Sequence, residues 1–181
     1  MYDGYRLVHT ATEDLQTFTV VGVVRWIDLH CDRFGTSHGS SLKGVRARAR
    51  ARYTLSLESP KDDTQKQAFA TATSNLLELQ QTSSEPSSPS ARGVVANQLG
   101  PPVLKFEKDV FNEYFGEERL WVWDERGFDV SQEQANDILE GSLVKVTFRL
   151  EKKIGVRRDV VTGELVRVDV LKRALGGGIL P

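Results

Sequence analysis

Apolar and polar residues alternate almost strictly from Val45 to Leu57. The odd positions are apolar, and the even positions begin with four arginines: Arg46, Arg48, Arg50 and Arg52. Successive side chains of a strand point to opposite faces, so a strand here has one apolar face and one face with four guanidinium groups. Like charges in such a row repel one another. The segment therefore predicts a strand whose basic face is covered by an anionic ligand or by carboxylates.

A second strand is predicted over residues 17–29, which are rich in β-branched and aromatic residues on both parities. Gly22 lies in its middle, where a glycine commonly marks a bulge or a sharp bend. A long bent strand of this kind can belong to both sheets of a small barrel. Trp26 is expected in the core. The glycine- and serine-rich residues 31–44 form the loop that leads to the arginine strand.

Weaker patterns follow in the middle of the chain. Residues 62–81 are weakly helical, and their apolar positions fall roughly on one face. Those positions are Phe69, Thr73, Leu76 and Leu77. The serine- and proline-rich residues that follow cannot bury enough apolar surface to become ordered. We therefore expect residues 60–116 to be an insertion between core strands, with a mobile tip at residues 82–93.

Three short elements are predicted between this tip and the last third of the chain. Residues 103–116 predict an extended piece and then a helix that ends at Gly116. Residues 120–124 form a short strand that contains two tryptophans. Ser131 is placed as the N-cap of a short helix over residues 132–139.

Two alternating strands are predicted in the last third. The first covers residues 142–150 and the second residues 164–171. The second directs three valines toward the core: Val166, Val168 and Val170. The connection between the strands has its turn at Thr162 and Gly163, and its length suits a projecting hairpin. It carries four cations on its flanks: Lys152, Lys153, Arg157 and Arg158.

The order of these elements is long bent strand, alternating strand, insertion, tryptophan strand, short helix, strand and strand. A mainly β, five-stranded Greek-key barrel with one helix before its fourth strand has this layout. The chain therefore resembles the OB fold, the oligonucleotide/oligosaccharide-binding barrel, over residues 17–57 and 118–174. Residues 141–148 are similar to the helix-to-strand junction of single-stranded DNA-binding barrels of the replication protein A type. We expect one domain over residues 1–174 and a flexible tail at residues 175–181.

The OB resemblance implies a binding surface. In OB folds, strands two and three form the ligand-facing side, and the loops between strands one and two and between strands four and five clamp the ligand. The arginine strand and the tryptophan strand would then lie side by side beneath two basic loops. The implied nucleic-acid-binding residues on strands are Arg46, Arg48, Arg50, Arg52, Trp121, Trp123, Lys145 and Arg149. Those in loops are Arg33, Phe34, His38, Lys43, Lys152, Lys153, Arg157 and Arg158.

Charge is segregated along a chain whose net charge is only −1. Residues 43–52 carry five cations and no anion, whereas residues 105–140 hold four Lys/Arg against eleven Asp/Glu. Residues 141–181 hold nine against four. Local basic surface therefore remains despite the near-neutral total, but the acidic block could also neutralise the arginines internally. Both explanations of the arginine face stay open, as do core and binding roles for Trp121 and Trp123.

Catalytic and membrane functions find little support. The three histidines are scattered, and His30, Cys31 and Asp32 do not have the spacing of metal ligands. Glycines 176–178 lie outside any strand-to-helix context that would hold a phosphate. A single cysteine excludes an internal disulfide, and there is neither a signal-peptide pattern nor an apolar run of membrane-spanning length. We expect no catalytic residue, metal or cofactor, and a soluble intracellular protein, nuclear or cytoplasmic.

These patterns together predict a non-enzymatic module that binds single-stranded nucleic acid, DNA in the first instance. Backbone charge and base stacking would supply the affinity, so binding would depend weakly on base sequence. Such a module would act in DNA replication, repair or telomere-type maintenance, together with other protein subunits. The alternative is a structural OB-type subunit that binds another protein through its sheet edge or through residues 60–116.

Overall fold

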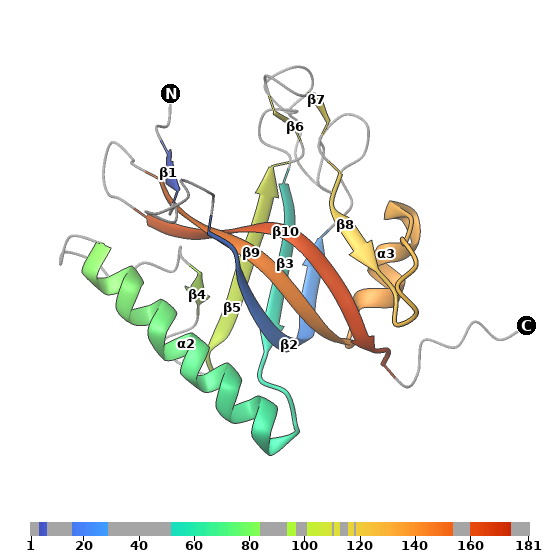
Figure 1. Ribbon diagram of the computed structural model, residues 1–181, viewed down its shortest axis with the longest axis horizontal. Coiled ribbons are helices and arrows are strands. Elements are labelled where there is room, and N and C mark those ends of the chain that lie inside the picture. The colour runs from blue at the N-terminus through green and yellow to red at the C-terminus, as the bar shows by residue number, and fades with distance from the viewer. Residues whose placement is uncertain are drawn as a thin grey trace, which may run out of the picture.

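The computed structural model describes residues 4–6, 16–28, 52–83, 94–96, 101–109, 111–112, 116–117, 119–153 and 160–174. The strands are β1 (Gly4–Arg6), β2 (Phe18–Asp28), β3 (Arg52–Glu58), β4 (Val95–Ala96), β5 (Val103–Asp109), β6 (Phe111–Asn112), β7 (Gly116–Glu117), β8 (Trp121–Trp123), β9 (Leu143–Lys153) and β10 (Val160–Lys172). The helices are α2 (Asp63–Ser83) and α3 (Gln132–Leu139). Both helices lie outside the ring of strands (Figure 1).

Five of the described strands close into a barrel. The strand order of the main sheet is β1-β9-β2-β3-β5-β10-β8, and β9 also pairs with β10, which closes the ring β9-β2-β3-β5-β10 (Figure 1). Within this ring, β5 and β10 run parallel and the other neighbours are antiparallel. The helix α3 directly precedes β9. The predicted mainly β, OB-type barrel with a short helix before its fourth strand is therefore confirmed.

The strand β2 belongs to both halves of the barrel, as its pattern predicts. Its first half pairs with β9 and its second half with β3. A Cβ atom at Gly22 would lie 3.0 Å from Leu57 Cβ and 3.1 Å from Phe69 Cε2, so glycine lets β3 and α2 approach this strand closely. The register shift lies a few residues later, at Arg25. Glycine thus permits the close approach, while the bulge itself follows it.

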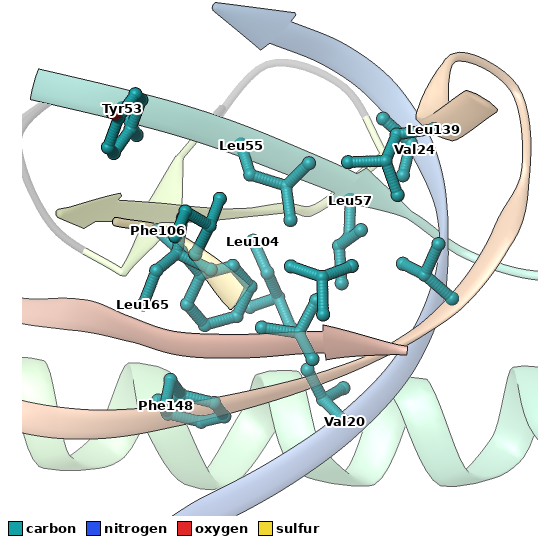
Figure 2. Close-up of a cluster of buried hydrophobic side chains, with 14 of the residues drawn as sticks. Val20, Val24, Tyr53, Leu55, Leu57, Leu104, Phe106, Leu139, Phe148 and Leu165 are labelled. Atoms are coloured by element: carbon teal, nitrogen blue, oxygen red, sulfur yellow. The ribbon is translucent and has the colours of Figure 1, made fainter. Parts of the chain in front are cut away.

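The hydrophobic core fills the inside of the barrel. The odd positions of β3, Tyr53, Leu55 and Leu57, are buried, as the alternation predicts. The ring centroids of Phe106 and Phe148 lie 4.7 Å apart, which joins β5 to β9 across the interior. Figure 2 shows side chains from four strands converging there: Leu55, Leu57, Leu104, Phe106, Phe148 and Leu165.

The third strand of the barrel is β5, and two predictions about this region are wrong. Residues 103–109 pair with β3 and with β10, so they belong to the barrel and not to an insertion. The tryptophan strand β8, predicted to be the third strand, pairs with β10 and with no other named strand of the described chain. The helix predicted to end at Gly116 is also wrong, because the described residues beyond β5 form the short pair β6 and β7. The segment between β3 and β5 is correspondingly shorter than residues 60–116.

The helix α2 confirms the weak helical pattern that its residues show. Phe69, Thr73 and Leu76 are buried and Leu77 is half-buried, so the predicted apolar face is the packed one. The Asp62 carboxylate accepts a hydrogen bond from the Gln65 backbone N–H at 3.0 Å and so caps the helix start. Residues 82 and 83, placed in the predicted tip, belong to this helix. The rest of that tip lies outside the described residues, as does the tail at 175–181.

The strand β10 starts earlier than predicted and contains a bulge. Thr162 and Gly163 lie within it and form no turn. A Cβ atom at Gly163 would lie 2.7 Å from Phe106 Cδ1, so this glycine makes room for a core ring. A register shift follows Leu165, after which the buried positions are Val168 and Val170. The bulge leaves Val166 half-buried, so its predicted inward position is wrong, while those of the two later valines are confirmed.

The helix α3 begins after Ser131, as predicted. The Ser131 backbone carbonyl accepts hydrogen bonds from the N–H groups of Gln134 and Ala135, but its side chain makes no capping hydrogen bond. No helix in the described part of the chain is long and apolar enough to cross a membrane.

Candidate nucleic-acid interface

The outer side of β3 and β5 is the ligand-facing side of an OB barrel. Thr54, Lys105 and Glu107 are half-buried on this side, whereas Ser56 is buried and donates a hydrogen bond to the Trp26 carbonyl at 3.3 Å. Lys105 Nζ lies 2.9 Å from Glu107 Oε1, so these two charges compensate each other. The strand register sets Arg52 directly opposite Asp109, which brings the acidic block to the start of the arginine strand. Among the described residues of β3 and β5, the charges on this side therefore compensate one another.

Trp26 lies on the outer wall beside β3, where the sequence predicted a core residue. Its side chain is 51% exposed, and its backbone is paired with Ser56 of β3. The prediction is wrong because the bulge at Arg25 shifts the alternation of β2. Val24 is buried before the bulge and Ile27 packs against the core after it, so Trp26 points outward. Arg25 is exposed beside it.

Trp26 is thus a candidate binding residue that the sequence patterns missed. Its ring has no cation stacked over it within the described residues. The one signal in the sequence was that β2 is apolar on both parities, which leaves open which apolar residues face outward. A half-exposed indole next to the ligand-facing side offers a surface on which an unpaired base can stack.

Trp121 and Trp123 lie on a different part of the barrel wall from the arginine strand. The strand β8 pairs in parallel with β10, with Trp121 opposite Arg167 and Trp123 opposite Asp169. The prediction that the tryptophans stand next to the arginine strand is therefore wrong. Val122 between them is buried, whereas Trp121 is 49% exposed and Trp123 is half-buried. Both indoles thus belong to the outer wall, and the core role left open for Trp121 is excluded.

A guanidinium group covers each of these two indoles. Arg119 Cζ lies 5.3 Å from the centroid of the Trp121 ring, and Arg167 Cζ lies 4.9 Å from that of Trp123. Both distances are within the roughly 6 Å at which cations interact with an aromatic face. We call this group the tryptophan–guanidinium surface; together with the carboxylates that hold the arginines, it consists of Arg119, Trp121, Trp123, Asp129, Arg167 and Asp169.

Carboxylates fix both guanidinium groups in place. Arg119 donates to Asp129 Oδ1 at 2.9 Å and to the Val130 carbonyl at 3.0 Å. Arg167 Nε donates to Asp169 Oδ1 at 2.7 Å. Each arginine thus donates to a carboxylate while its guanidinium lies over an indole, and these hydrogen bonds favour the stacked arrangement.

Two more predicted site residues lie on the outer face of β9. Lys145 Nζ is 3.5 Å from Asp169 Oδ2, so it borders the tryptophan–guanidinium surface. Arg149 stands opposite Glu164 of β10, and its Nε is buried with no hydrogen-bond partner among the described residues. Lys152 is half-buried near the end of β9, paired in register with Tyr5 of β1.

The remaining predicted contacts lie outside the described residues. They are Lys43, Arg46, Arg48, Arg50, Arg157 and Arg158, the side chains of Arg52 and Lys153, and the loop residues Arg33, Phe34 and His38.

A tight turn joins the end of β8 to the residues before α3. Asp124 Oδ1 accepts hydrogen bonds from the backbone N–H groups of Phe128 and Arg126 at 2.8 and 2.9 Å. The Phe128 hydrogen bond is the main cause that lowers the pKa of Asp124 below its ordinary value, and Arg173 and Arg126 add to it. Arg173 also donates to Glu125 at 2.8 Å, which ties the end of β10 to this turn. Within the described residues, no cluster of His, Cys, Asp or Glu side chains could hold a metal ion.

The closed ring, the parallel pair β5–β10 and the helix before β9 define an OB-fold protein. No family model matches the sequence, and no curated protein matches it either. Solved structures share the fold. The single-stranded DNA-binding protein from bacteriophage Enc34 superposes with a TM-score of 0.56 at 13% identity, over 91% of this chain and 87% of its own.

The same phage protein in complex with single-stranded DNA gives a TM-score of 0.57 at 13% identity, over 87% of both chains. The single-stranded DNA-binding protein encoded by bacteriophage T7 gives 0.52 at 17% identity, over 92% of this chain and 97% of that one. At such low identity, the likeness is one of fold, and it extends over most of each chain.

Proposed function

We propose that this protein binds single-stranded DNA on the ligand-facing side of its barrel. The observation that carries the proposal is the half-exposed indole of Trp26 on the wall next to β3, the strand into which the arginine segment leads. An aromatic face beside a run of cations is the combination that single-strand binding uses, because bases stack on the ring while phosphates meet the cations. Duplex DNA keeps its base faces covered and cannot use the ring.

The two contributions have different magnitudes and different salt dependence. Each stacked base contributes about 1–3 kcal/mol, and this term depends little on salt. Each phosphate contact on a single strand steepens the fall of log K with log salt concentration by about 0.7. Arg46, Arg48 and Arg50, together with Lys43 and the cations of the β9–β10 connection, are the proposed phosphate contacts. Every base has a stacking face, so weak sequence preference follows.

The structural neighbours support DNA as the ligand. All three are structures of single-stranded DNA-binding proteins, and one of them is a complex with single-stranded DNA. Their barrels and the present one share the fold over most of each chain. A place in DNA replication, repair or telomere-type maintenance is part of the same proposal, because exposed single strands arise there.

The proposal is tested by fluorescence anisotropy with a labelled single-stranded oligonucleotide across a salt series, with the duplex of the same sequence for comparison. The decisive variant is Arg48→Glu with Arg50→Glu. Its matched control is Lys61→Glu with Lys66→Glu, because both lysines are exposed at the start of α2 and the change in net charge is the same.

We expect the wild-type protein to prefer the single strand. The arginine variant should bind about 100-fold more weakly and lose about 1.4 from its salt slope, because two phosphate contacts are removed. The lysine variant should bind within a few-fold of wild type. Equal affinity for duplex and single strand, or equal effects of the two variants, would overturn the proposal.

A further inference from the structure

We propose that the tryptophan–guanidinium surface is a second contact for single-stranded DNA, separate from the ligand-facing side of β3 and β5. This inference rests on the proposed function. The surface lies on β8 and β10, and Trp121, Trp123 and Arg167 form its centre. A DNA strand bound beside Trp26 would have to continue around the barrel wall to reach the tryptophan–guanidinium surface. This surface would therefore lengthen the binding site.

The geometry suits extended single strands. Trp121 and Trp123 are two residues apart on one strand and point to the same side, so their Cα atoms lie about 7 Å apart. This spacing lets neighbouring nucleotides of an extended strand each meet one Trp–Arg pair. The guanidinium over each ring adds a second planar surface, because arginine also stacks on bases. Each Trp–Arg pair therefore offers a preformed stack that a base can join.

The charge of this surface is nearly balanced. Arg119, Arg167 and Lys145 supply three cations, and Asp129 and Asp169 supply two carboxylates that hold them. Phosphates gain little from cations that are already paired, so stacking has to supply most of the binding free energy. This contact should accordingly respond weakly to salt, unlike the arginine segment.

Strand addition by a protein partner does not fit this surface. One edge of β8 is hydrogen bonded to β10. Its other edge is occupied by the residues after the turn, since the Val130 N–H donates to the Val122 carbonyl at 2.8 Å and Trp123 bridges to Asp129. Both edges of β8 are therefore already used for backbone pairing within the described chain. What the surface offers outward is aromatic and guanidinium planes, the chemistry that takes unpaired bases.

The first test uses the fact that the chain has only three tryptophans. Trp26→Phe keeps an aromatic ring on β2 and leaves Trp121 and Trp123 as the only indole emitters. This protein is titrated with unlabelled oligothymidylates of about 8 and about 30 nucleotides, lengths below and well above a typical single OB site. Anisotropy of the same labelled oligonucleotides shows in parallel that binding occurs. We expect the long oligonucleotide to quench the emission strongly and the short one to quench it weakly.

The second test compares Trp121→Ala with Leu79→Ala. Both side chains are large, apolar and similarly exposed, at 49% and 42%, but Leu79 lies on α2. We expect Trp121→Ala to weaken binding of the long oligonucleotide at least fivefold, the effect of one stacked base, by the same factor at low and high salt. The short oligonucleotide should bind as before. Leu79→Ala should change neither affinity.

The outcomes separate this inference from the proposed function. Binding by anisotropy without quenching of Trp121 and Trp123, or unchanged long-oligonucleotide affinity in Trp121→Ala, overturns the second contact and leaves the proposed function intact. If neither the wild-type protein nor any variant binds single-stranded DNA, the proposed function and the second contact are both overturned. A change in the sedimentation coefficient on mutating Trp121, without a change in DNA affinity, would assign the surface to contact between copies and overturn the inference. Should Trp121→Ala fold poorly, the Trp26→Phe titration still decides.

Discussion

Trp26 and the pair Trp121 and Trp123 lie on the outer wall of one barrel, yet their rings are prepared differently. The Trp26 indole has no cation over it in the described chain, although Arg25 is exposed beside it. The other two indoles each carry a guanidinium that a carboxylate holds in place. For Trp26 (the first surface), the stacking ring and the proposed phosphate-binding cations come from different segments of the chain. For Trp121 and Trp123 (the second surface), each ring and its cation belong to the same surface.

Under the two proposals, one barrel carries two aromatic contacts whose affinities for DNA should depend differently on salt concentration. Binding through phosphate contacts, as proposed for the arginines before β3, weakens steeply with salt. A ring whose cation is already neutralised gives binding that salt changes little, because stacking remains. Hydrogen bonds from each guanidinium to a carboxylate also reduce the conformational freedom that these side chains would lose on binding.

The largest effect is expected from a substitution on β10 that lowers the free energy of unfolding and so affects both surfaces. The strands β5 and β8 pair in succession along one edge of β10, so both surfaces depend on that edge. Gly163→Val places a branched side chain against the buried Phe106 ring, and we expect a loss of about 3 kcal/mol in the free energy of unfolding. Urea denaturation measures it. Thr162→Val, on the outward side of the same strand, is the control and should stay within about 0.5 kcal/mol of wild type.

The next effect is confined to the first surface. Trp26→Ala removes one stacking ring, and we expect about 30-fold weaker binding of both short and long oligothymidylates, about 2 kcal/mol. Stability should change little, because half of the side chain is exposed. Trp26→Phe should retain most of the affinity. Equal affinity of the alanine variant and wild type in the anisotropy assay would remove Trp26 from the site.

A smaller effect adjusts the charge of the second surface. Asp129→Asn releases Arg119 from its carboxylate, so the guanidinium becomes available to a phosphate. We expect binding of the long oligothymidylate to tighten a few-fold at low salt and its salt slope to steepen by about 0.7. Asp137→Asn removes the same charge from the exposed face of α3 and is the control. Equal gains in the two variants would point to net charge alone.

The smallest effect comes from the turn that follows β8. The pKa of Asp124 is lowered below its ordinary value of 3.8 by the Phe128 hydrogen bond and by nearby cations. A group with a lowered pKa stabilises the folded state above its unfolded pKa, and that contribution is lost as pH falls through the folded value. We therefore expect the emission of Trp121 and Trp123 in Trp26→Phe protein to change below about pH 4. Asp124→Asn should make this change smaller, and a change of the same size in that variant would contradict the assignment.

Much of the barrel could be predicted because local patterns determine it. The alternation of residues 45–57 predicted the buried face of β3, and the apolar residues around Gly22 predicted a strand shared by both halves. Strand pairing was the part that failed. Residues 103–109 and 120–124 both look like short strands, and only the pairing with β3 decides which one completes the barrel. That pairing is set by contacts between distant segments, which no local pattern contains.

The candidate site was harder to predict for a related reason. A bulge shifts the alternation by one residue without leaving a clear sequence signal, and the two bulges at Arg25 and after Leu165 changed the positions of Trp26 and Val166. The stacks of Arg119 and Arg167 on the indoles also depend on β8 meeting β10. Residue types alone indicated that tryptophans and arginines are candidates for nucleic-acid binding. The strand register decides which of these side chains lie next to one another.

The close packing at Gly22 has a consequence for how the chain can be shortened or can diverge. The Phe69 ring of α2 is almost fully buried, and its Cε2 occupies the space that a side chain at position 22 would need. Replacing α2 by a tight turn would remove this ring and open the end of the barrel to water. The helix is therefore part of the hydrophobic core and cannot be deleted without loss of stability. In homologous chains we expect positions 22 and 69 to vary together, with a side chain at the first accompanied by a smaller residue at the second.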